Sequence, residues 1–270
     1  IGGKPVNQIL GSTLGTLIFA LVFSMSQGIH LASGMDLFLG ILSGIGWAAG
    51  QIVTFYCFSL IGSSKVMPIT TAFQLLAASL WGVVALGNWP GVSAKILGAF
   101  SLILIIFGAS LTVWSEEKTP ASTGLLRKVV IFLALGAIGY WAYSAAPQAS
   151  NLSGQEAFLP QAIGMLLTAL IYSIVISFKE KSKMAIFESV SYKHIISGFF
   201  FAFAALTYLI SAQPDMNGLA TGFILSQTSV VLATLTGIWF LNQRKTKKEM
   251  LLTIIGLVLI IIAASITVTI

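Results

Sequence analysis

Charged residues are scarce in this chain, and so are cysteine and histidine. Of 270 residues, 14 are Lys or Arg and 8 are Asp or Glu, so charge makes up 8% of the sequence, against about 25% in soluble domains. Such a composition excludes an ordinary soluble fold. The single cysteine, Cys57, can form no internal disulfide, and we expect it to pack as a small apolar residue. The two histidines, His30 and His194, lie at the ends of different apolar runs, so no zinc cluster is expected.

Apolar residues replace the missing charge and make up 57% of the sequence. A bilayer core is about 30 Å thick, so a helix needs roughly 20 largely apolar residues to cross it. Each apolar run here is far longer than a barrel strand, which favours helices. The sequence therefore predicts an all-α polytopic membrane protein with nine transmembrane helices in this chain. The predicted spans are Gln8–Leu31, Asp36–Ile61, Val66–Gly87, Ser93–Ser115, Lys128–Pro147, Ala157–Phe178, Tyr192–Gln213, Gly218–Leu241 and Lys248–Thr269.

The distribution of basic residues predicts the orientation of these spans. All but one of the 14 Lys and Arg residues fall on one side of the predicted spans, and only Lys95 falls on the other. Short loops rich in Lys and Arg remain in the cytoplasm, so we expect cytoplasmic basic loops and an extracellular C-terminus at Ile270. Because the net charge of +6 resides in these short loops, we expect no nucleic-acid partner.

The two halves of the sequence resemble each other at a nearly constant offset. Gln8 aligns with Gln161 at an offset of 153, and Ile41–Gly44 aligns with Ile195–Gly198 at an offset of 154. The fifth predicted span has no partner, so we expect the chain to lack the first helix of a ten-helix protein. Two repeats of five helices have opposite orientations, which is the inverted symmetry of many secondary transporters. The expected division is a first repeat at 1–115, a cytoplasmic linker at 116–127 and a second, inverted repeat at 128–270.

Ionisable residues are nearly absent from the predicted spans, which limits the chemistry. Asp36, Glu156 and Asp215 lie at extracellular helix ends. They are fallback candidates for proton coupling, and the simpler interpretation is that they are ordinary helix-end carboxylates. No span combines a serine with a histidine, or two carboxylates, as hydrolysis would require. We therefore expect no enzyme activity, no cofactor and no metal site.

The spans instead carry amides, hydroxyls and aromatic rings. These groups suit a neutral, hydroxyl-rich substrate, because each hydroxyl taken out of water needs a partner and a Gln amide both donates and accepts. Gln74 and Gln227 align in the two repeats, which favours a shared site. The alternative is that such residues simply join helices or form aromatic belts. The candidate substrate-binding residues are Gln51, Gln74, Gln227, Trp47, Tyr140, Trp141 and Thr71.

Four segments carry a resemblance to a known family: Gly2–Pro5, Gly62–Gln74, Tyr140–Gln148 and Gly218–Ser229. With GSSKVMPITTAFQ, YWAYSAAPQ and GLATGFILSQTS in the last three, the sequence resembles the bacterial glucose/ribose porter family, of the staphylococcal type. This family belongs to the drug/metabolite transporter superfamily, and the resemblance runs along the whole chain. It implies a ten-helix inverted-repeat fold in the bacterial cell membrane. It also implies uptake of a monosaccharide by proton symport or facilitated diffusion.

Together, these features predict a secondary transporter that takes up a neutral monosaccharide by alternating access, with glucose ahead of ribose. Both uniport and proton symport remain open, and the lack of a buried carboxylate in the nine spans favours uniport unless the missing helix supplies one. An exporter of drugs or small metabolites is the rival within transport, but a cationic-drug pump would be expected to show a membrane-embedded acid. A membrane scaffold or sensor is the rival outside transport. The oligomeric state stays open.

Overall fold

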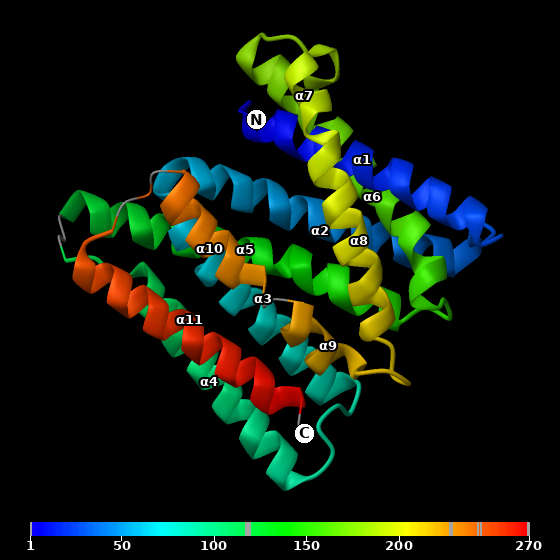
Figure 1. Cartoon of the computed structure of the whole chain (residues 1–270). Coiled ribbons are helices and arrows are strands. Elements are labelled where there is room, and N and C mark those ends of the chain that lie inside the picture. Colours follow the sequence, from blue (N-terminus) through cyan, green and yellow to red (C-terminus); the bar gives the residue numbers. More distant parts are fainter. Residues whose placement is uncertain (1, 117–119, 227–228, 242, 244, 269–270) are drawn as a thin grey trace. The chain divides into compact units, whose positions relative to one another are not determined.

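The protein is built from helices (Figure 1). The computed structural model describes residues 2–116, 120–226, 229–241, 243 and 245–268, and no strand occurs among them. This part of the chain confirms the predicted all-α architecture. The longer helices are α1 (Pro5–Ser26), α2 (Gly34–Ile61), α3 (Ser63–Ala85), α4 (Val92–Val113), α5 (Pro120–Gln148), α6 (Gly154–Glu180), α8 (Ile195–Ser211), α9 (Gly218–Ser226), α10 (Ser229–Phe240) and α11 (Lys247–Val268).

Seven helical segments of the described chain are long and apolar enough to cross a membrane. Six of them correspond to α1 through α6, and the seventh is Gly218–Phe240, in which residues 227–228 lie outside the described part. Helix α8 is apolar but has only 17 residues. Large apolar side chains such as Phe200 and Leu232 are exposed, as expected for surfaces that face lipid. The count of nine spans stays a prediction.

Two connections are more helical than the sequence suggests. Helix α5 begins at Pro120, so most of the stretch 116–127, expected as a linker, is helical. Proline at a helix start loses no hydrogen bond, because the first N–H groups of a helix have no internal partner. Between α6 and α8, the expected loop contains the short elements η1 (Ala185–Phe187) and α7 (Ser189–Lys193).

The helices pack into two compact units, each of which combines distant parts of the chain. Unit 1 is formed by Ile1–Phe55 and Ile138–Met216, and unit 2 by Tyr56–Ala137 and Asn217–Ile270. Each unit therefore takes helices from both predicted repeats. The repeats are defined by sequence similarity and the units by packing, so the predicted division into repeats stays a prediction.

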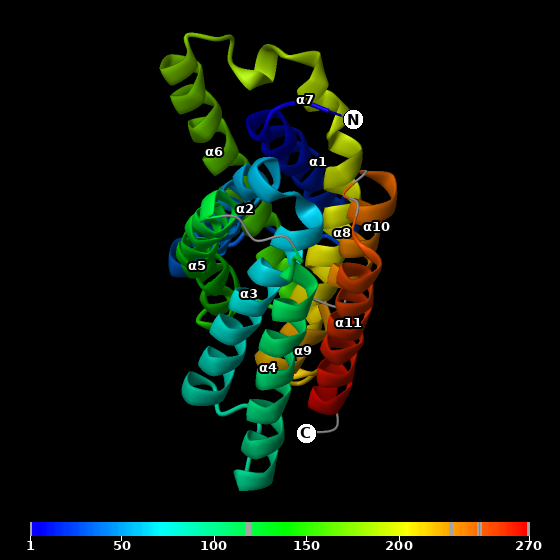
Figure 2. The same cartoon turned by 90° about the vertical axis from the view of Figure 1, so that its left-hand side faces the viewer.

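Unit 1 is centred on α1, which packs against both α6 and α8 (Figure 2). The helices approach closely because small residues lie at their contacts. A Cβ added to Gly15 of α1 would lie 2.2 Å from the carbonyl oxygen of Ile195. The side chains of Ile9, Phe158 and Met165 are fully buried nearby in the same unit.

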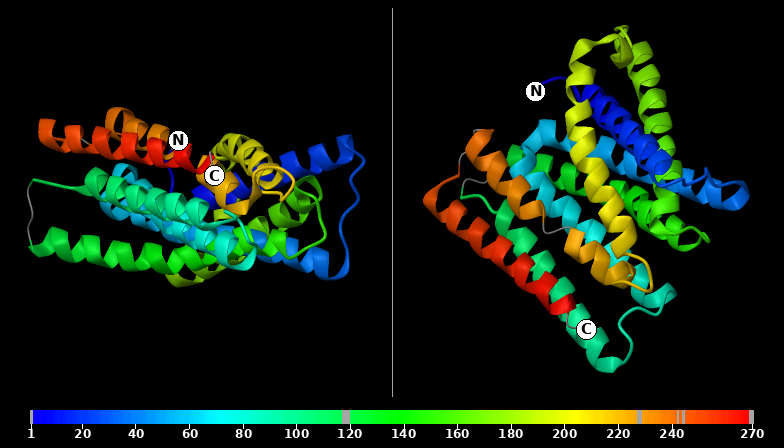
Figure 3. Two further views of the ribbon diagram at one scale, coloured as in Figure 1. Left: turned by 90° about the horizontal axis from the view of Figure 1, so that it is seen from below. Right: turned by 45° about the vertical axis from the view of Figure 1, so that its right-hand side comes forward.

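Unit 2 contains α4 and α11 side by side (Figure 3). Here Gly108 and Gly256 bring the two backbones together, because a Cβ on Gly256 would lie 2.3 Å from the carbonyl oxygen of Gly108. Helix α3 packs against α4, α9 and α10. Val230, Leu257 and Ile260 form a buried apolar cluster in this unit.

Candidate functional site

One face of α2 in unit 1 carries polar and aromatic side chains at helical spacing. Ser43, Trp47, Gln51 and Thr54 follow one another at steps of four, four and three residues, which places them on one side of the helix. Ser43, Trp47 and Thr54 are buried, and Gln51 is half-buried. This face therefore turns into the protein rather than toward lipid.

The facing stretch of α5 supplies tyrosines with the same periodicity. Tyr140 and Tyr143 are both buried, and the Tyr140 hydroxyl donates to the Gln51 amide oxygen at 2.7 Å. The Thr54 hydroxyl lies 3.0 Å from the same Tyr140 oxygen and 3.0 Å from the carbonyl oxygen of Gly50. No described residue accepts a hydrogen bond from the Gln51 amide nitrogen, so this cluster retains donors for another molecule.

A second buried hydrogen-bond chain links α2, α5 and α6. The Ser43 hydroxyl donates to the carbonyl oxygen of Tyr143 at 2.7 Å, and the Gln161 amide nitrogen donates to the Ser43 oxygen at 2.7 Å. Gln161 has no exposed surface. Sequence reasoning used Gln161 only as a marker of the repeat and missed it as a site residue. The available signal was an amide placed about one turn inside the predicted span Ala157–Phe178.

Aromatic rings of α2 and α5 stack on rings of α8 next to these polar groups. The rings of Tyr143 and Tyr208 stack with centroids 5.4 Å apart. The ring of Trp47 stacks on Phe201 at 4.2 Å. Trp47 is one of the substrate-binding candidates from the sequence, and in the structure one side of its indole stacks against Phe201.

A cavity of about 100 Å³ lies in the same unit. Its wall includes Gln148, five residues after Tyr143 on α5, and Ala157, which precedes Gln161 by one turn of α6. On the side of α8 the wall includes Leu209 and Gln213. The cavity therefore has room for several water molecules beside the buried polar groups.

The other candidate substrate-binding residues are Gln74, Thr71, Trp141 and Gln227. Gln74 and Thr71 are buried in unit 2, where the Gln74 amide donates to the Thr70 hydroxyl at 3.0 Å. Trp141 is 36% exposed, in contrast to the buried Tyr140 that precedes it. Gln227 lies outside the described residues.

The three candidate carboxylates belong to unit 1, where Asp36 is half-buried and Glu156 and Asp215 are exposed. A carboxylate oxygen of Asp36 accepts a hydrogen bond from the backbone N–H of Asn151 at 3.0 Å. Glu156 forms a capping box with Ser153 at the start of α6, an arrangement that satisfies free backbone donors. Asp215 is exposed in the connection after α8. The described residues include no group of His, Cys, Asp and Glu that could hold a metal ion.

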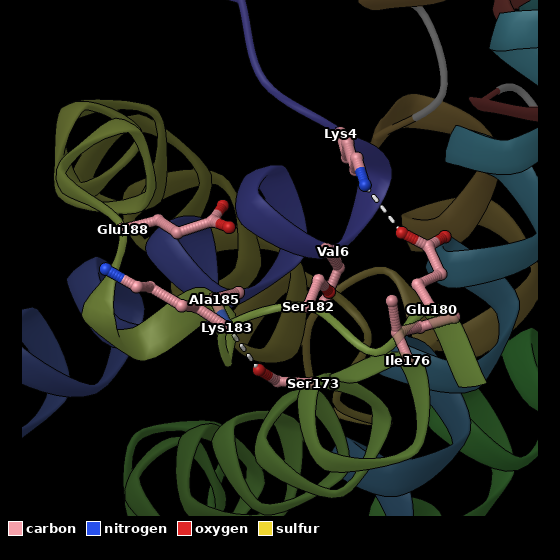
Figure 4. Close-up of a pocket in the computed structure, with 9 residues that line it drawn as sticks. All are labelled: Lys4, Val6, Ser173, Ile176, Glu180, Ser182, Lys183, Ala185 and Glu188. Atoms are coloured by element: carbon pink, nitrogen blue, oxygen red, sulfur yellow. Dashed lines mark hydrogen bonds and ion pairs between the residues drawn. The ribbon is translucent and has the colours of Figure 1, made fainter. Parts of the chain in front are cut away.

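A small charged pocket lies at the start of α1 (Figure 4). The Lys4 ammonium pairs with Glu180 at 2.5 Å, and the Asn7 amide donates to Glu188 at 2.5 Å. The pocket volume is about 10 Å³, which is space for a single water molecule. These contacts tie the α6–α8 connection to α1, and the pocket is too small for a sugar.

A lysine in unit 2 joins the ends of two helices. The Lys245 ammonium donates to the carbonyl oxygen of Thr112 at the end of α4 and to the Thr253 hydroxyl of α11 at 2.7 Å. Burial and the neighbouring charge of Lys65 lower the pKa of Lys245 to about 8, although Glu249 opposes the shift. A cation at the end of α4 is favourable for the helix dipole, so this contact stabilises the junction.

The family described as "Sugar transport protein" matches residues 1–270. The chain belongs to this sugar transport family. It is a transporter and not an enzyme, and its apolar helices identify it as a multi-pass membrane protein.

Three relatives share most of their length with this chain, and each is named "Putative ribose uptake protein RbsU". The protein from Enterococcus faecalis is 69% identical over 270 residues, which are 100% of this chain and 92% of the relative. The protein from Lactiplantibacillus plantarum is 68% identical over the same shares. The protein from Staphylococcus epidermidis is 63% identical over 267 residues, which are 99% of this chain and 90% of the relative. These names refer to ribose, the alternative substrate of the sequence prediction, and not to glucose.

Proposed function

We propose that this sugar transporter takes up ribose across the bacterial cell membrane. The observation that carries the proposal is the 69% identity, over the whole chain, to a protein named for ribose uptake. Ribose is therefore preferred to glucose as the substrate.

The Gln51–Tyr140–Thr54 cluster is the proposed sugar contact in unit 1. A sugar hydroxyl must exchange its hydrogen bonds to water for bonds to protein, or the transfer is costly. The Gln51 amide nitrogen offers donors, while its oxygen is fixed by Tyr140. Trp47 and Trp141 are proposed as aromatic neighbours of the sugar. Gln74, Thr71 and Gln227 are proposed as contacts from the rest of the chain.

An inverted repeat and alternating access complete the proposed mechanism. Gly44 of α2 and Gly198 of α8 occupy aligned positions, with an offset of 154. A Cβ on Gly44 would lie 1.9 Å from the carbonyl oxygen of Gln161 on α6, and a Cβ on Gly198 would lie 2.2 Å from that of Ser12 on α1. Since α1 and α6 are also aligned, equivalent helix pairs use equivalent glycines, which supports the repeat.

The coupling mode is proposed as uniport or proton symport, with Asp36, Glu156 and Asp215 as candidate proton carriers. An imposed pH gradient across proteoliposomes distinguishes the two modes. Accumulation of ribose above equilibrium supports symport, and equilibration alone supports uniport. If accumulation persists after all three carboxylates are changed to their amides, none of them carries the proton.

Counterflow of labelled ribose tests the substrate. Liposomes that contain the full chain are preloaded with unlabelled ribose and diluted into labelled ribose without an ion gradient. Transient accumulation above empty liposomes is expected, and ribose should compete better than glucose. A folded protein that exchanges glucose but not ribose would overturn the choice of substrate, and one that exchanges neither would overturn sugar uptake.

A further inference from the structure

Gln161 has a hydrogen-bonding atom without a partner in the interior of unit 1. Its amide oxygen is buried and meets no donor among the described residues. The side chain as a whole has no exposed surface. Buried polar atoms are nearly always paired, so an unpaired amide oxygen points to a missing partner such as a ligand or water.

The identity of the free atom follows from counting protons. The Ser43 hydroxyl has one proton, which it donates to the carbonyl oxygen of Tyr143. The Ser43 oxygen can then only accept from Gln161, so the amide nitrogen faces Ser43. The amide oxygen is left as an acceptor that lacks a donor.

Gln161 does not itself line the neighbouring cavity of unit 1, but the uncharged wall of that cavity bears on what the donor can be. The cavity of about 100 Å³ begins one turn away along α6, at Ala157. Its polar groups are the amides of Gln148 and Gln213 and the hydroxyl of Ser150, and no charged residue lines it. A phosphorylated sugar would need a cation in this wall, whereas an uncharged polyol would not.

We propose that the Gln161 amide oxygen accepts a hydrogen bond from one hydroxyl of the transported sugar, and that this contact sets the preference for that hydroxyl. The proposal rests on the proposed function as a sugar transporter. It adds Gln161 as a specificity-determining residue, held in place by Ser43. The Gln51–Tyr140 cluster then contacts other hydroxyls of the same substrate.

Deoxy sugars test this contact one hydroxyl at a time. Unlabelled ribose and its 2-, 3- and 5-deoxy analogues are added as competitors to the counterflow of labelled ribose. The ratio of each analogue's inhibition constant to that of ribose gives the preference for the missing hydroxyl. For the wild type, at least one analogue should bind about tenfold more weakly than ribose, as for the loss of one buried hydrogen bond. In Gln161→Met, which keeps the side-chain length, the preference for that hydroxyl should vanish.

The outcomes separate this inference from the proposed function. A wild type that exchanges no sugar overturns both. If the wild type exchanges ribose, and Gln161→Met shows the same hydroxyl preferences as the wild type, only the role of Gln161 is overturned. If Gln161→Met binds ribose and all of its deoxy analogues more weakly by the same factor, the role of Gln161 is purely structural. That result also overturns the proposed contact.

Two further variants complete the test. Gln8→Met changes the aligned, half-buried glutamine of α1 and should keep the hydroxyl preference. If Gln161→Met fails to fold, Gln161→Asn retains the amide but withdraws it by one methylene. The preference for the same hydroxyl should then fall, and an unchanged preference overturns the proposal.

Discussion

The Tyr140 hydroxyl of α5 donates to the Gln51 amide oxygen of α2 at 2.7 Å. This bond fixes the orientation of an amide whose nitrogen has no acceptor among the described residues. Tyr140→Phe removes the hydroxyl and lets the amide rotate. Because a buried hydrogen bond contributes about 1 kcal/mol, we expect the KM for ribose to rise about fivefold to tenfold in counterflow assays.

Tyr56→Phe is the matched control for this change. Tyr56 is 41% exposed, so its hydroxyl is not enclosed in the interior, and its removal should leave the KM unchanged. If Tyr140→Phe also transports with the wild-type KM, then the Gln51–Tyr140 pair joins two helices and does not contact the sugar.

Close packing at Gly44 gives a prediction about stability. A Cβ at this position would lie 1.9 Å from the carbonyl oxygen of Gln161, so Gly44→Ala must push α2 and α6 apart. Overpacking of this kind costs about 1–3 kcal/mol or more, and we expect a clear fall in the melting temperature in detergent. Gly124→Ala is the control, because a Cβ there meets no atom within 4 Å. Equal melting temperatures for wild type and Gly44→Ala would show that the helices separate without cost.

Gln74 provides a test of the substrate contacts in unit 2. Its amide donates to Thr70 at 3.0 Å and is nearly buried. Gln74→Ala should raise the KM for ribose about tenfold, as expected for the loss of a polar contact to substrate, with normal amounts of protein in the membrane. Gln27→Ala, at an exposed position after α1, should behave as wild type. Unchanged transport kinetics in Gln74→Ala would remove this residue from the site.

The lowered pKa of Lys245 leads us to expect that the stability of the protein depends on pH. Its pKa is about 8 in the folded protein against 10.5 for the free side chain, so the unfolded chain binds more protons between these values. Stability therefore rises as pH increases from about 8 to 10.5. The rise should amount to about 2 kcal/mol after allowance for solvent around the partly exposed amine.

Lys245→Met isolates this contribution. The variant lacks the titrating amine, so its free energy of unfolding should rise less than that of the wild type over the same pH range. The comparison is of slopes, because the variant also loses the bonds to Thr112 and Thr253. Parallel curves would show that Lys245 keeps an ordinary pKa.

The sequence predicts the helices well because the bilayer sets their length. Runs of about 20 apolar residues become α1 to α6 with small shifts at their ends. Helix α5 starts early at Pro120, and η1 and α7 occupy an expected loop. These differences arise where the chain leaves the apolar runs and hydropathy no longer constrains it.

The site is harder to predict for a physical reason. In a membrane, side chains that face lipid are as apolar as those in the interior, so hydrophobic periodicity does not reveal the buried face. Gln51 and Tyr140 were proposed from the sequence because an amide and a phenol hydroxyl stand out in an apolar span. Their mutual hydrogen bond, and the pairing of Gln161 with Ser43, depend on helix rotation that no local pattern encodes.

Cys57 is the only cysteine of the chain, and its side chain is fully buried as expected. Thiol-reactive probes therefore find no exposed native target on the folded protein. A single cysteine introduced at an exposed position such as Ser189 can carry a fluorophore or a nitroxide without removal of a native residue. The natural sequence thus serves directly as a background for spectroscopic measurement of movement during the transport cycle.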